Sequence, residues 1–496
     1  MKNRHFDVLI IGAGISGVGA ACHLSRECPE KSVAILERRK AMGGTWDLFR
    51  YPGIRSDSDM FTFGFNFRPW TNPKTLADGP SIKQYVIDTA REYGVDKKIH
   101  YGLKVTGATW SSKAQKWTVE TVNEETGEKS EYTGAFLMLC TGYYNYDHGY
   151  KPDFPGEKNF GGQIIHPQHW PEDLDYAGKR VVIIGSGATA VTLLPAMADK
   201  TKHITMLQRS PTYMMSLPAK DPMALRLKGL LPEMAIYRLM RARNIAMQRF
   251  SFIAARNYPE QARRLLLRLA RRQLGKNVDM RHFTPSYQPW DQRLCAMPNG
   301  DFFKAIRDGK ASIATGKIKT FTKKGIQLES GEELSADIII TATGLDLQMM
   351  GGATLSVDGK THKASDSMLY KSVLIENVPN AGIVTGYTNA SWTLRADLVA
   401  EYVCRLLKHM DEKGYAAVTP VDREGCKTSD TVFGTLNSGY VTRAADRLPK
   451  QGSSGPWKVT HDYFRDLVLL RRGAMEDECL RFEKPLVGRT AYPSAA

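Results

Sequence analysis

The chain has 496 residues, of which 42% are hydrophobic and 24% charged, a composition typical of a globular protein with about three domains. No stretch approaches the ~20 consecutive apolar residues of a membrane span, and the polar, basic residues 1–7 lack the pattern of a secretory signal. From these features we expect a cytoplasmic protein.

The formal net charge of +16 is concentrated in residues 221–280, which hold thirteen Lys and Arg but only four Asp and Glu. The aromatic and glycine patterns of single-strand readers are missing there, so nucleic acid is not an expected partner. An anionic cofactor or an anionic membrane surface fits this charge better. The seven cysteines are scattered without a CxxC pair, which indicates reduced thiols, and we identify no metal site.

The first predicted elements form a βαβ unit, with a strand over 6–11, a helix to about residue 25 and a strand over 32–37. The turn after the first strand reads Gly12-Ala-Gly14-Ile-Ser-Gly17. Its glycines permit a tight turn and a close approach of the backbone to a pyrophosphate at the helix N-terminus. Glu37 ends the second strand, where a carboxylate binds ribose hydroxyl groups. The combination predicts a dinucleotide site rather than a glycine turn without ligand.

A second βαβ unit is predicted over 181–208, with a strand over 181–184, a turn and helix over 185–198 and a strand over 203–208. Its turn, Gly185-Ser-Gly187-Ala-Thr-Ala190, is the same fingerprint with the accepted alanine at its end. The following strand ends in Gln208-Arg209-Ser210, without an acid. Arg209 can pair with a 2′-phosphate that an acid would repel, unless it is only a solvated surface arginine. The first site should therefore hold FAD and the second NADPH.

The remaining pattern completes the predicted fold. Apolar strands over 136–142 and 337–344 end in similar turns, the Leu- and Arg-rich stretch 219–276 predicts helices, and another helix is expected over 394–410. The fold class is α/β, with two Rossmann-like dinucleotide-binding domains and a helical insertion. We expect the FAD-binding domain to comprise 1–150 and 346–496, the NADPH-binding domain 151–215 and 289–345, and the insertion 216–288.

Two dinucleotide sites in one chain imply hydride transfer from a nicotinamide to a flavin. Disulfide reductases of similar layout carry a redox-active cysteine pair beside the flavin, and this sequence has no such pair. The electrons must therefore go elsewhere, and O2 is the obvious acceptor.

A further motif precedes the second glycine turn. The segment from Phe160 through Gly162 and His166 to Trp170-Pro171 matches the pattern FxGxxxHxxxWP. Essentially the whole chain resembles the type I Baeyer–Villiger monooxygenases, a group of the class B flavoprotein monooxygenases. The resemblance rests on this motif, on the order of all motifs and on segments 44–57, 290–294 and 389–393. The related N-oxygenating flavin monooxygenases lack the closing Trp-Pro.

The resemblance implies a reaction. Reduced FAD captures O2 as a C4a-peroxide, which attacks a ketone, and the adduct rearranges to an ester or lactone. Arg293 matches the family's active-site arginine, a fixed cation that stabilises the peroxide anion and the developing oxyanion. Asp57 matches the acid that pairs with it. Without the motif context, either residue would be interpreted as an ordinary ion-pair residue.

The resemblance also implies two sets of cofactor contacts and two further roles. His166, on the linker to the NADPH domain, organises domain movement or is purely structural, and Trp392 lines the nicotinamide or substrate pocket or is plain core. The FAD contacts are Gly12, Gly14, Ser16, Gly17, Glu37, Gly44, Thr45, Trp46, Asp47, Leu48, Tyr51, Asp57 and Val105. The NADP contacts are Arg55, Ser56, Ile184, Gly185, Ser186, Gly187, Ala188, Thr189, Ala190, Gln208, Arg209 and Ser210.

Alternatives remain for the substrate and for the coenzyme. The same flavin intermediate, when protonated, oxygenates sulfur or nitrogen, so sulfides and thioamides are expected substrates beside ketones, and an S/N-oxygenating enzyme is the alternative. A non-enzyme alternative is an idle basic flavin-binding protein, against which Arg293 and Asp57 argue. Many family members have Lys before the arginine, where this chain has Gln292, so preference for NADPH depends more on Arg209.

The basic insertion generates one expectation about location. Its arginines and leucines can form a basic amphipathic face that associates weakly with anionic lipid at the inner face of the membrane, unless the face is simply solvated. The residues of this face are Arg263, Arg264, Arg268, Arg271 and Arg272 beside Leu265, Leu266 and Leu269.

Overall fold

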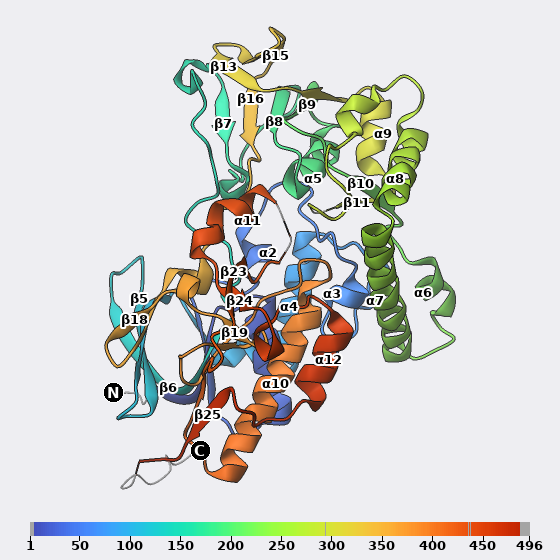
Figure 1. Cartoon of the computed structure of the whole chain (residues 1–496). Coiled ribbons are helices and arrows are strands. Elements are labelled where there is room, and N and C mark those ends of the chain that lie inside the picture. Colours follow the sequence, from blue (N-terminus) through green and yellow to red (C-terminus); the bar gives the residue numbers. More distant parts are fainter. Residues whose placement is uncertain (1–3, 293, 435, 437, 487–496) are drawn as a thin grey trace.

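The computed structural model describes residues 4–292, 294–434, 436 and 438–486. Two sheets lie at opposite ends of the molecule, and a helical arm runs along one side of it (Figure 1). Among the described residues, none of the helices combines the length and the apolar content that crossing a bilayer requires.

The larger sheet is organised around β1 (His5–Ile11), which lies parallel to and between β2 (Val33–Glu37) and β6 (Lys129–Leu139). Its four apolar residues Val8 to Ile11 are all buried, as expected for a strand covered on both faces. Late segments of the chain return to this sheet, because β21 (Ala381–Ile383) lies parallel to β6. Its other strands are β3 (Ile99–Tyr101), β4 (Lys104–Ser111), β5 (Lys116–Val122), β17 (Thr354–Val357), β18 (Lys360–His362), β19 (Leu369–Tyr370) and β20 (Leu374–Ile375).

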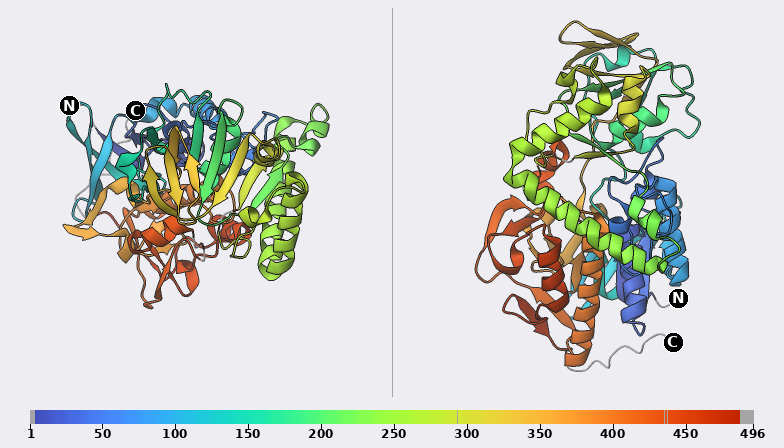
Figure 2. Two further views of the ribbon diagram at one scale, coloured as in Figure 1. Left: turned by 90° about the horizontal axis from the view of Figure 1, so that it is seen from above. Right: turned by 90° about the vertical axis from the view of Figure 1, so that its right-hand side faces the viewer.

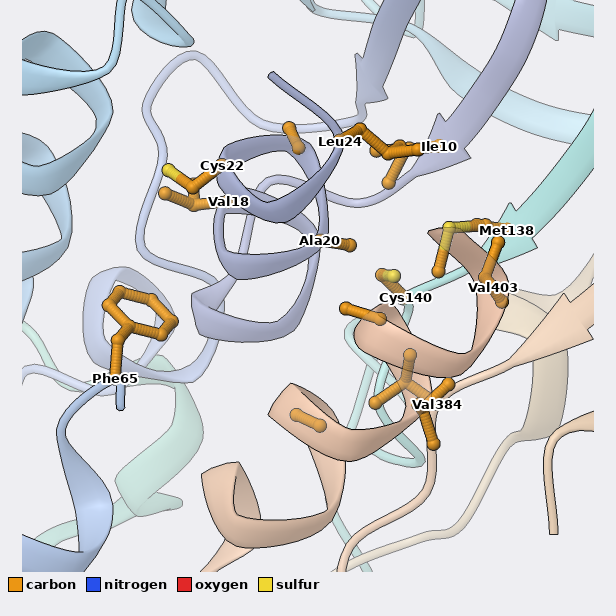
Figure 3. Close-up of a cluster of buried hydrophobic side chains, with 14 of the residues drawn as sticks. Ile10, Val18, Ala20, Cys22, Leu24, Phe65, Met138, Cys140, Val384 and Val403 are labelled. Carbon is orange, nitrogen blue, oxygen red and sulfur yellow. The ribbon is translucent and has the colours of Figure 1, made fainter. Parts of the chain in front are cut away.

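Helix α1 (Ile15–Glu27) packs between this sheet and α10 (Trp392–Lys413). Figure 3 shows Ala20 and Leu24 of α1 directed toward Ile10 and Met138 of the strands and toward Val403 of α10. Gly19 lets another neighbour approach, because a Cβ there would lie 2.6 Å from the ring of Phe65. Other helices here are α2 (Thr45–Leu48), α3 (Met60–Phe63), α4 (Gly79–Glu92) and α12 (Tyr463–Arg472).

The second sheet is wholly parallel, in the order β12-β9-β8-β16-β7. Its strands are β7 (Gln163–Ile165), β8 (Arg180–Ile184), β9 (His203–Gln208), β12 (Ala311–Thr315) and β16 (Ile338–Thr341), with α5 (Ala188–Met197) and α9 (Asp301–Arg307) against it. A small antiparallel sheet of β13 (Ile318–Thr322), β14 (Gly325–Leu328) and β15 (Glu333–Ser335) is inserted before β16.

The helical arm consists of α6 (Pro222–Leu227), α7 (Glu233–Asn257) and α8 (Pro259–Leu274). Prolines divide the predicted helical stretch into these three parts, since Pro232 precedes α7 and Pro259 opens α8. Strand β10 (Met214–Leu217) precedes the arm and β11 (Cys295–Pro298) follows it. These two strands pair with each other in parallel. Figure 2 shows α7 and α8 meeting at an angle along the edge of the molecule.

The predicted fold class, α/β with two Rossmann-like units and a helical insertion, is confirmed. The residues at which one domain gives way to the next remain predictions. Helices α4 and α12 were not predicted, and the C-terminal region also contains the pairs β22 (Ala417–Pro420) with β25 (Leu480–Glu483) and β23 (Lys427–Thr431) with β24 (Lys450–Gly452), and α11 (Gly439–Ala444).

One buried arginine fastens the arm to the larger domain. Arg241 of α7 donates hydrogen bonds to the carbonyl oxygens of Phe61 (3.0 Å) and Gly64 (2.8 Å), at the ends of α3, and its Nη2 lies 3.1 Å from Oδ2 of Asp397 in α10. Both charged side chains are more than nine-tenths buried. Removal of one partner would leave a buried charge with reduced compensation, which is strongly destabilising.

We therefore expect Arg241→Ala to lower the free energy of unfolding by about 3–5 kcal/mol, measured by urea denaturation. Arg238→Ala is the matched control, because Arg238 lies one turn earlier on α7 and is exposed. Surface substitutions usually change stability by no more than ~0.5 kcal/mol. Equal stability of the two variants would show that the buried pair does not fasten the arm.

Candidate active site

A cavity of about 530 Å³ lies where the glycine turns of the two sheets face each other. Gly12 and Gly14 from the turn after β1 line it, and so do Ser186 and Gly187 from the turn after β8. In parallel sheets, ligands bind outside the carboxyl ends of the strands, which is where both turns lie. The fold thus joins the two predicted dinucleotide sites in one cavity.

Two glycines of the turn after β1 cannot be replaced by residues with side chains. Gly12 has φ +98°, and a Cβ there would lie 2.9 Å from the carbonyl oxygen of Cys140, while a Cβ on Gly17 would lie 1.9 Å from that of Gly12. No side chain caps the N-terminus of α1, so its first N–H groups remain available to a ligand. The turn therefore fits an anionic group such as a pyrophosphate.

Glu37 lines the cavity beside the turn after β1. Its carboxylate accepts hydrogen bonds from the backbone N–H groups of Ala13 (2.6 Å) and Arg39 (2.7 Å), one on each oxygen. Burial raises the pKa of Glu37, against the lowering effect of these two N–H groups. Each oxygen keeps a further lone pair, so the fixed carboxylate can still accept from ribose hydroxyl groups.

The second turn is more open. A Cβ on Gly187 would meet no atom within 4 Å, and no side chain caps the N-terminus of α5. Arg209, directly after β9, is exposed. Its charge acts on Arg443, whose pKa is lowered first by burial and further by Arg209. Two cations close enough for their charges to interact favour an anionic group such as a 2′-phosphate.

Arg55 provides the clearest sign of a missing anion. Its side chain is 10% exposed and lines the cavity, and only Nη1 has a partner of its own, Oδ2 of Asp301 at 2.7 Å. Nε and Nη2 are buried without a hydrogen-bond partner among the described residues. An arginine fork satisfies such donors on a phosphate or a comparable anion. The residues present therefore fit a phosphate-containing cofactor.

Of the predicted catalytic pair, Asp57 is among the described residues and Arg293 is not. Asp57 lines the cavity. Arg293 lies outside the described residues, but Gln292 before it and Cys295 after it both line the cavity. Asp57, Gln292 and Cys295 thus share one cavity, and the position of the Arg293 side chain remains a prediction.

The other predicted contacts divide into two groups. Those that line the cavity are Ser16, Gly44, Thr45, Trp46, Tyr51, Ser56, Val105, Ala188 and Thr189. Those outside its lining are Gly17, Asp47, Leu48, Ile184, Gly185, Ala190, Gln208, Arg209 and Ser210.

Two of the outlying residues have other partners. The buried Asp47 carboxylate lies 2.6 Å from both Nε of Arg39 and Nζ of Lys83, which holds the loop before the cavity in place. The buried Gln208 amide donates to the carbonyl oxygen of His282 (2.7 Å) and to Thr315 Oγ1 (2.9 Å). Both side chains thus hold neighbouring segments in place and do not line the cavity themselves.

The fingerprint segment also lies outside the cavity lining. Phe160 packs edge-on to Phe321, Gly162 allows β7 to approach Asp337, and Trp170 packs on the core of the second sheet. His166 lies against Gly149, where a Cβ would be 2.1 Å from its ring, and burial lowers its pKa. The motif that includes Pro171 thus lies along the connection between the domains, and the role of His166 in domain movement remains a prediction.

Sequence reasoning missed several residues of the cavity wall. Tyr143, Tyr144 and Tyr146 follow β6 and line the cavity, although a cluster of aromatic residues at the carboxyl end of a parallel strand was a usable signal. For Trp392 the sequence allows either a pocket position or a core position. It lines the cavity, and its Nε1 donates to Ser16 Oγ at 2.7 Å, which joins the starts of α10 and α1.

The chain resembles known proteins over nearly its whole length. Residues 5–412 match the family model described as flavin-binding monooxygenase-like. MymA of Mycobacterium tuberculosis is 57% identical over 97% of this chain and 98% of its own. The FAD-containing monooxygenase EthA of the same organism is 54% identical over 97% of this chain and 98% of its own.

Solved structures show the same fold at lower identity. An oxidised steroid monooxygenase bound to NADP has a TM-score of 0.77 at 21% identity and covers 97% of this chain and 100% of its own. Cyclohexanone monooxygenase from Rhodococcus sp. Phi1, bound to NADP+, has a TM-score of 0.74 at 21% identity and covers 98% and 100%.

Proposed function

Because this chain belongs to the flavin-binding monooxygenase-like family, we propose that it is an FAD-containing, NADPH- and O2-dependent Baeyer–Villiger monooxygenase that converts ketones to esters or lactones. The observation that carries the proposal is the single cavity lined by both glycine turns, Asp57 and Gln292. That arrangement allows two dinucleotides to meet in the cavity that Gln292 lines. The sequence fingerprint, with its closing Trp-Pro, supports the Baeyer–Villiger reaction within the family.

In this proposal the turn after β1 holds the FAD pyrophosphate and Glu37 its ribose. The turn after β8, Arg55 and Arg209 hold the phosphates of NADPH. Bound FAD supplies redox chemistry, taking hydride from NADPH and activating O2.

The protein's own contribution is electrostatic and steric. Arg293 places a permanent positive charge where negative charge develops on oxygen, and such preorganised stabilisation is often the largest catalytic effect. Asp57 orients that guanidinium. Aromatic side chains, Tyr143 against Trp392 with ring centroids 5.3 Å apart, form a wall that limits access of water.

Oxygenation of sulfides or thioamides is the alternative activity of the same cavity. Its wall contains polarizable and aromatic groups, among them Met350, Phe63 and Trp392, which suit a soft sulfur-containing substrate. Product identification from matched ketones and thioethers, with FAD-loaded enzyme and NADPH, tests the proposal. Esters or lactones support it, sulfoxides alone favour the alternative, and NADPH consumption without any oxygenated product contradicts both.

We expect Arg293→Ala to keep FAD and to be reduced by NADPH, but to form ester ~10²–10³-fold more slowly, because a preorganised cation is lost. Reoxidation should then release hydrogen peroxide. Stopped-flow absorbance of both half-reactions, with product quantification, measures this. Arg293→Lys should rescue only in part, since an ammonium lacks the planar fork.

A surface arginine provides the control for Arg293→Ala. Arg281, whose side chain is 74% exposed, should tolerate substitution by Ala without a change in either half-reaction. Near-normal ester formation by Arg293→Ala would assign the catalytic cation to another residue.

We expect Arg209→Asp to raise the KM for NADPH roughly ten- to a hundredfold and to affect NADH little, because a charge-assisted contact to the 2′-phosphate becomes a repulsion. Lys202→Asp is the control, since Lys202 is exposed beside the other end of β9. An unchanged preference between NADPH and NADH in Arg209→Asp would contradict the assignment of the second nucleotide site.

The proposal extends to weak association with anionic lipid. Of the fifteen large hydrophobic residues exposed in the described chain, eleven belong to the arm. Along α7 an uncharged exposed stripe recurs every three to four residues, and Arg264, Arg268 and Arg272 are exposed along α8. Arg263, by contrast, is half-buried against Tyr213 and does not belong to the predicted face. The stripe consists of Ala235, Leu239, Ala242, Ala246, Phe250 and Ile253.

The combination of exposed apolar and basic side chains is complementary to anionic lipid, whereas a second copy of this chain would carry the same positive charge. We expect sedimentation with phosphatidylserine-containing vesicles at low salt, reduced by added salt, and strongly weakened in Leu239→Glu/Phe250→Glu. Leu486→Glu, also exposed but away from the arm, is the control. Equal sedimentation with neutral and anionic vesicles would contradict the idea.

A further inference from the structure

A second cavity, of about 110 Å³, lies between α7 and two segments of the larger domain. One of these segments leads into α10 and the other into α12. The lining residues are Ile245, Gln248, Arg249, Phe252 and Ile253 of α7, Asn389, Ala390 and Leu394, and Thr460, His461, Asp462 and Tyr463.

The second cavity adjoins the main one. Ala390 lines both. Tyr387 lines the main cavity, and its ring lies 6.5 Å from those of His461 and Tyr463 in the second. On the opposite side, Phe252 packs edge-on to Trp290 at 5.4 Å, two residues before Gln292. A ligand whose reactive end lies in the main cavity can therefore extend past Ala390 toward α7.

The residues of the wall of the second cavity include apolar side chains and two polar side chains, each of which has one buried acceptor atom without a partner among the described residues. Ile245, Phe252 and Leu394 are apolar. Among the described residues, Oδ1 of Asn389 and Nδ1 of His461 are buried without a hydrogen-bond partner. Buried polar atoms of this kind call for an explanation, because leaving one unpaired is costly.

The hydrogen bonds of these two side chains fix their unused atoms as acceptors. Asn389 Nδ2 donates to the carbonyl oxygen of His461 at 3.0 Å, which leaves Oδ1 to accept. His461 Nε2 donates to the carbonyl oxygen of Val432 at 3.0 Å, so in the neutral ring Nδ1 is a lone-pair acceptor. Burial, helped by the nearby Arg395 guanidinium, lowers the pKa of His461 to about 3, which keeps the ring neutral.

The charges at this cavity neutralise each other. Arg249 Nη2 lies 2.9 Å from Asp462 Oδ2, which joins α7 to the N-terminus of α12. No unpaired cation therefore remains among the described wall residues to attract an anion. A carboxylate would instead meet the lone pairs of Asn389 and His461, whereas a hydroxyl or an amide N–H would satisfy them.

We propose that this second cavity is a subsite for the part of the substrate remote from the reacting carbonyl, and that it accepts an apolar chain carrying a neutral hydrogen-bond donor. The inference rests on the proposed function, because the main cavity must hold the reacting end. The inference adds an order of affinity for the group at the far end of the substrate. A hydroxyl or an amide should bind more tightly than a methyl group, and a methyl group more tightly than a carboxylate.

Three methyl ketones of equal length, ending in a methyl, a hydroxyl or a carboxylate group, test this preference on the FAD-loaded enzyme. KM is measured with NADPH, and Kd by calorimetry without NADPH. The hydroxyl compound should bind roughly three- to tenfold more tightly than the methyl compound, which is the usual effect of one hydrogen bond. The carboxylate compound should bind most weakly. Equal affinities, or tightest binding of the carboxylate, would overturn the proposal.

Two variants locate the effect. His461→Phe removes the acceptor and should abolish the advantage of the hydroxyl compound. Ile253→Trp fills the cavity from its exposed side and should raise KM by a factor that grows with the chain length of the ketone. Val468→Trp on α12, where Val468 is exposed and is not part of the wall, is the control and should leave this dependence unchanged.

The outcomes separate the two proposals. An unchanged dependence on chain length in Ile253→Trp overturns the subsite, even if His461→Phe does not fold. Ester formation without the predicted order of affinities also overturns the subsite, while the proposed function stands. The predicted order of Kd values without any oxygenated product supports the subsite and contradicts the proposed function.

Discussion

Gly17 after β1 and Gly185 after β8 occupy positions where a side chain does not fit, and the arrangement of the site follows from that constraint. In the first turn a Cβ on Gly17 would lie 1.9 Å from the carbonyl oxygen of Gly12, and in the second a Cβ on Gly185, with φ +135°, would lie 2.2 Å from that of Ala342. The backbone can make these approaches only with glycine. Each turn therefore presents an uncapped helix N-terminus to the same cavity, and everything else in the site is placed around these two ends.

Buried charge holds the surrounding elements in position. Asp397 of α10 accepts from His23 of α1 at 3.3 Å, from Arg241 of α7 at 3.1 Å and from the backbone N–H of Asn66 at 2.9 Å. Burial opposes protonation of His23, but hydrogen bonds to Asp397 and Glu27 outweigh it and raise the pKa of His23 to about 9. One carboxylate thus connects three helices, and it keeps the arm in register with the larger domain.

Helix α7 has two faces with different chemistry. Ile245 and Phe252 face inward and form part of the wall of the second cavity, whereas Leu239 and Phe250 face solvent. Ile253 belongs to both the wall and the exposed stripe. The proposed lipid surface and the proposed subsite therefore share a boundary at Ile253. The paired charges of Arg249 and Asp462 belong to the wall of the second cavity as well.

The sequence alone determined the features that depend on neighbours in the chain. The glycine turns, Glu37 at the end of β2, the parallel strands and the helical nature of the insertion were all predicted, because strand and turn patterns are local and glycine positions reflect backbone sterics. The resemblance to the monooxygenase family also followed from continuous motifs. Only the tertiary structure decided which side chains meet. Asp47 and Gln208 were predicted as cofactor contacts, yet their partners, Lys83 and His282, are 36 and 74 residues away. The same reason explains why neither Tyr387 nor the second cavity could be predicted, since α7, Asn389 and His461 come together only through packing between segments that no sequence periodicity relates.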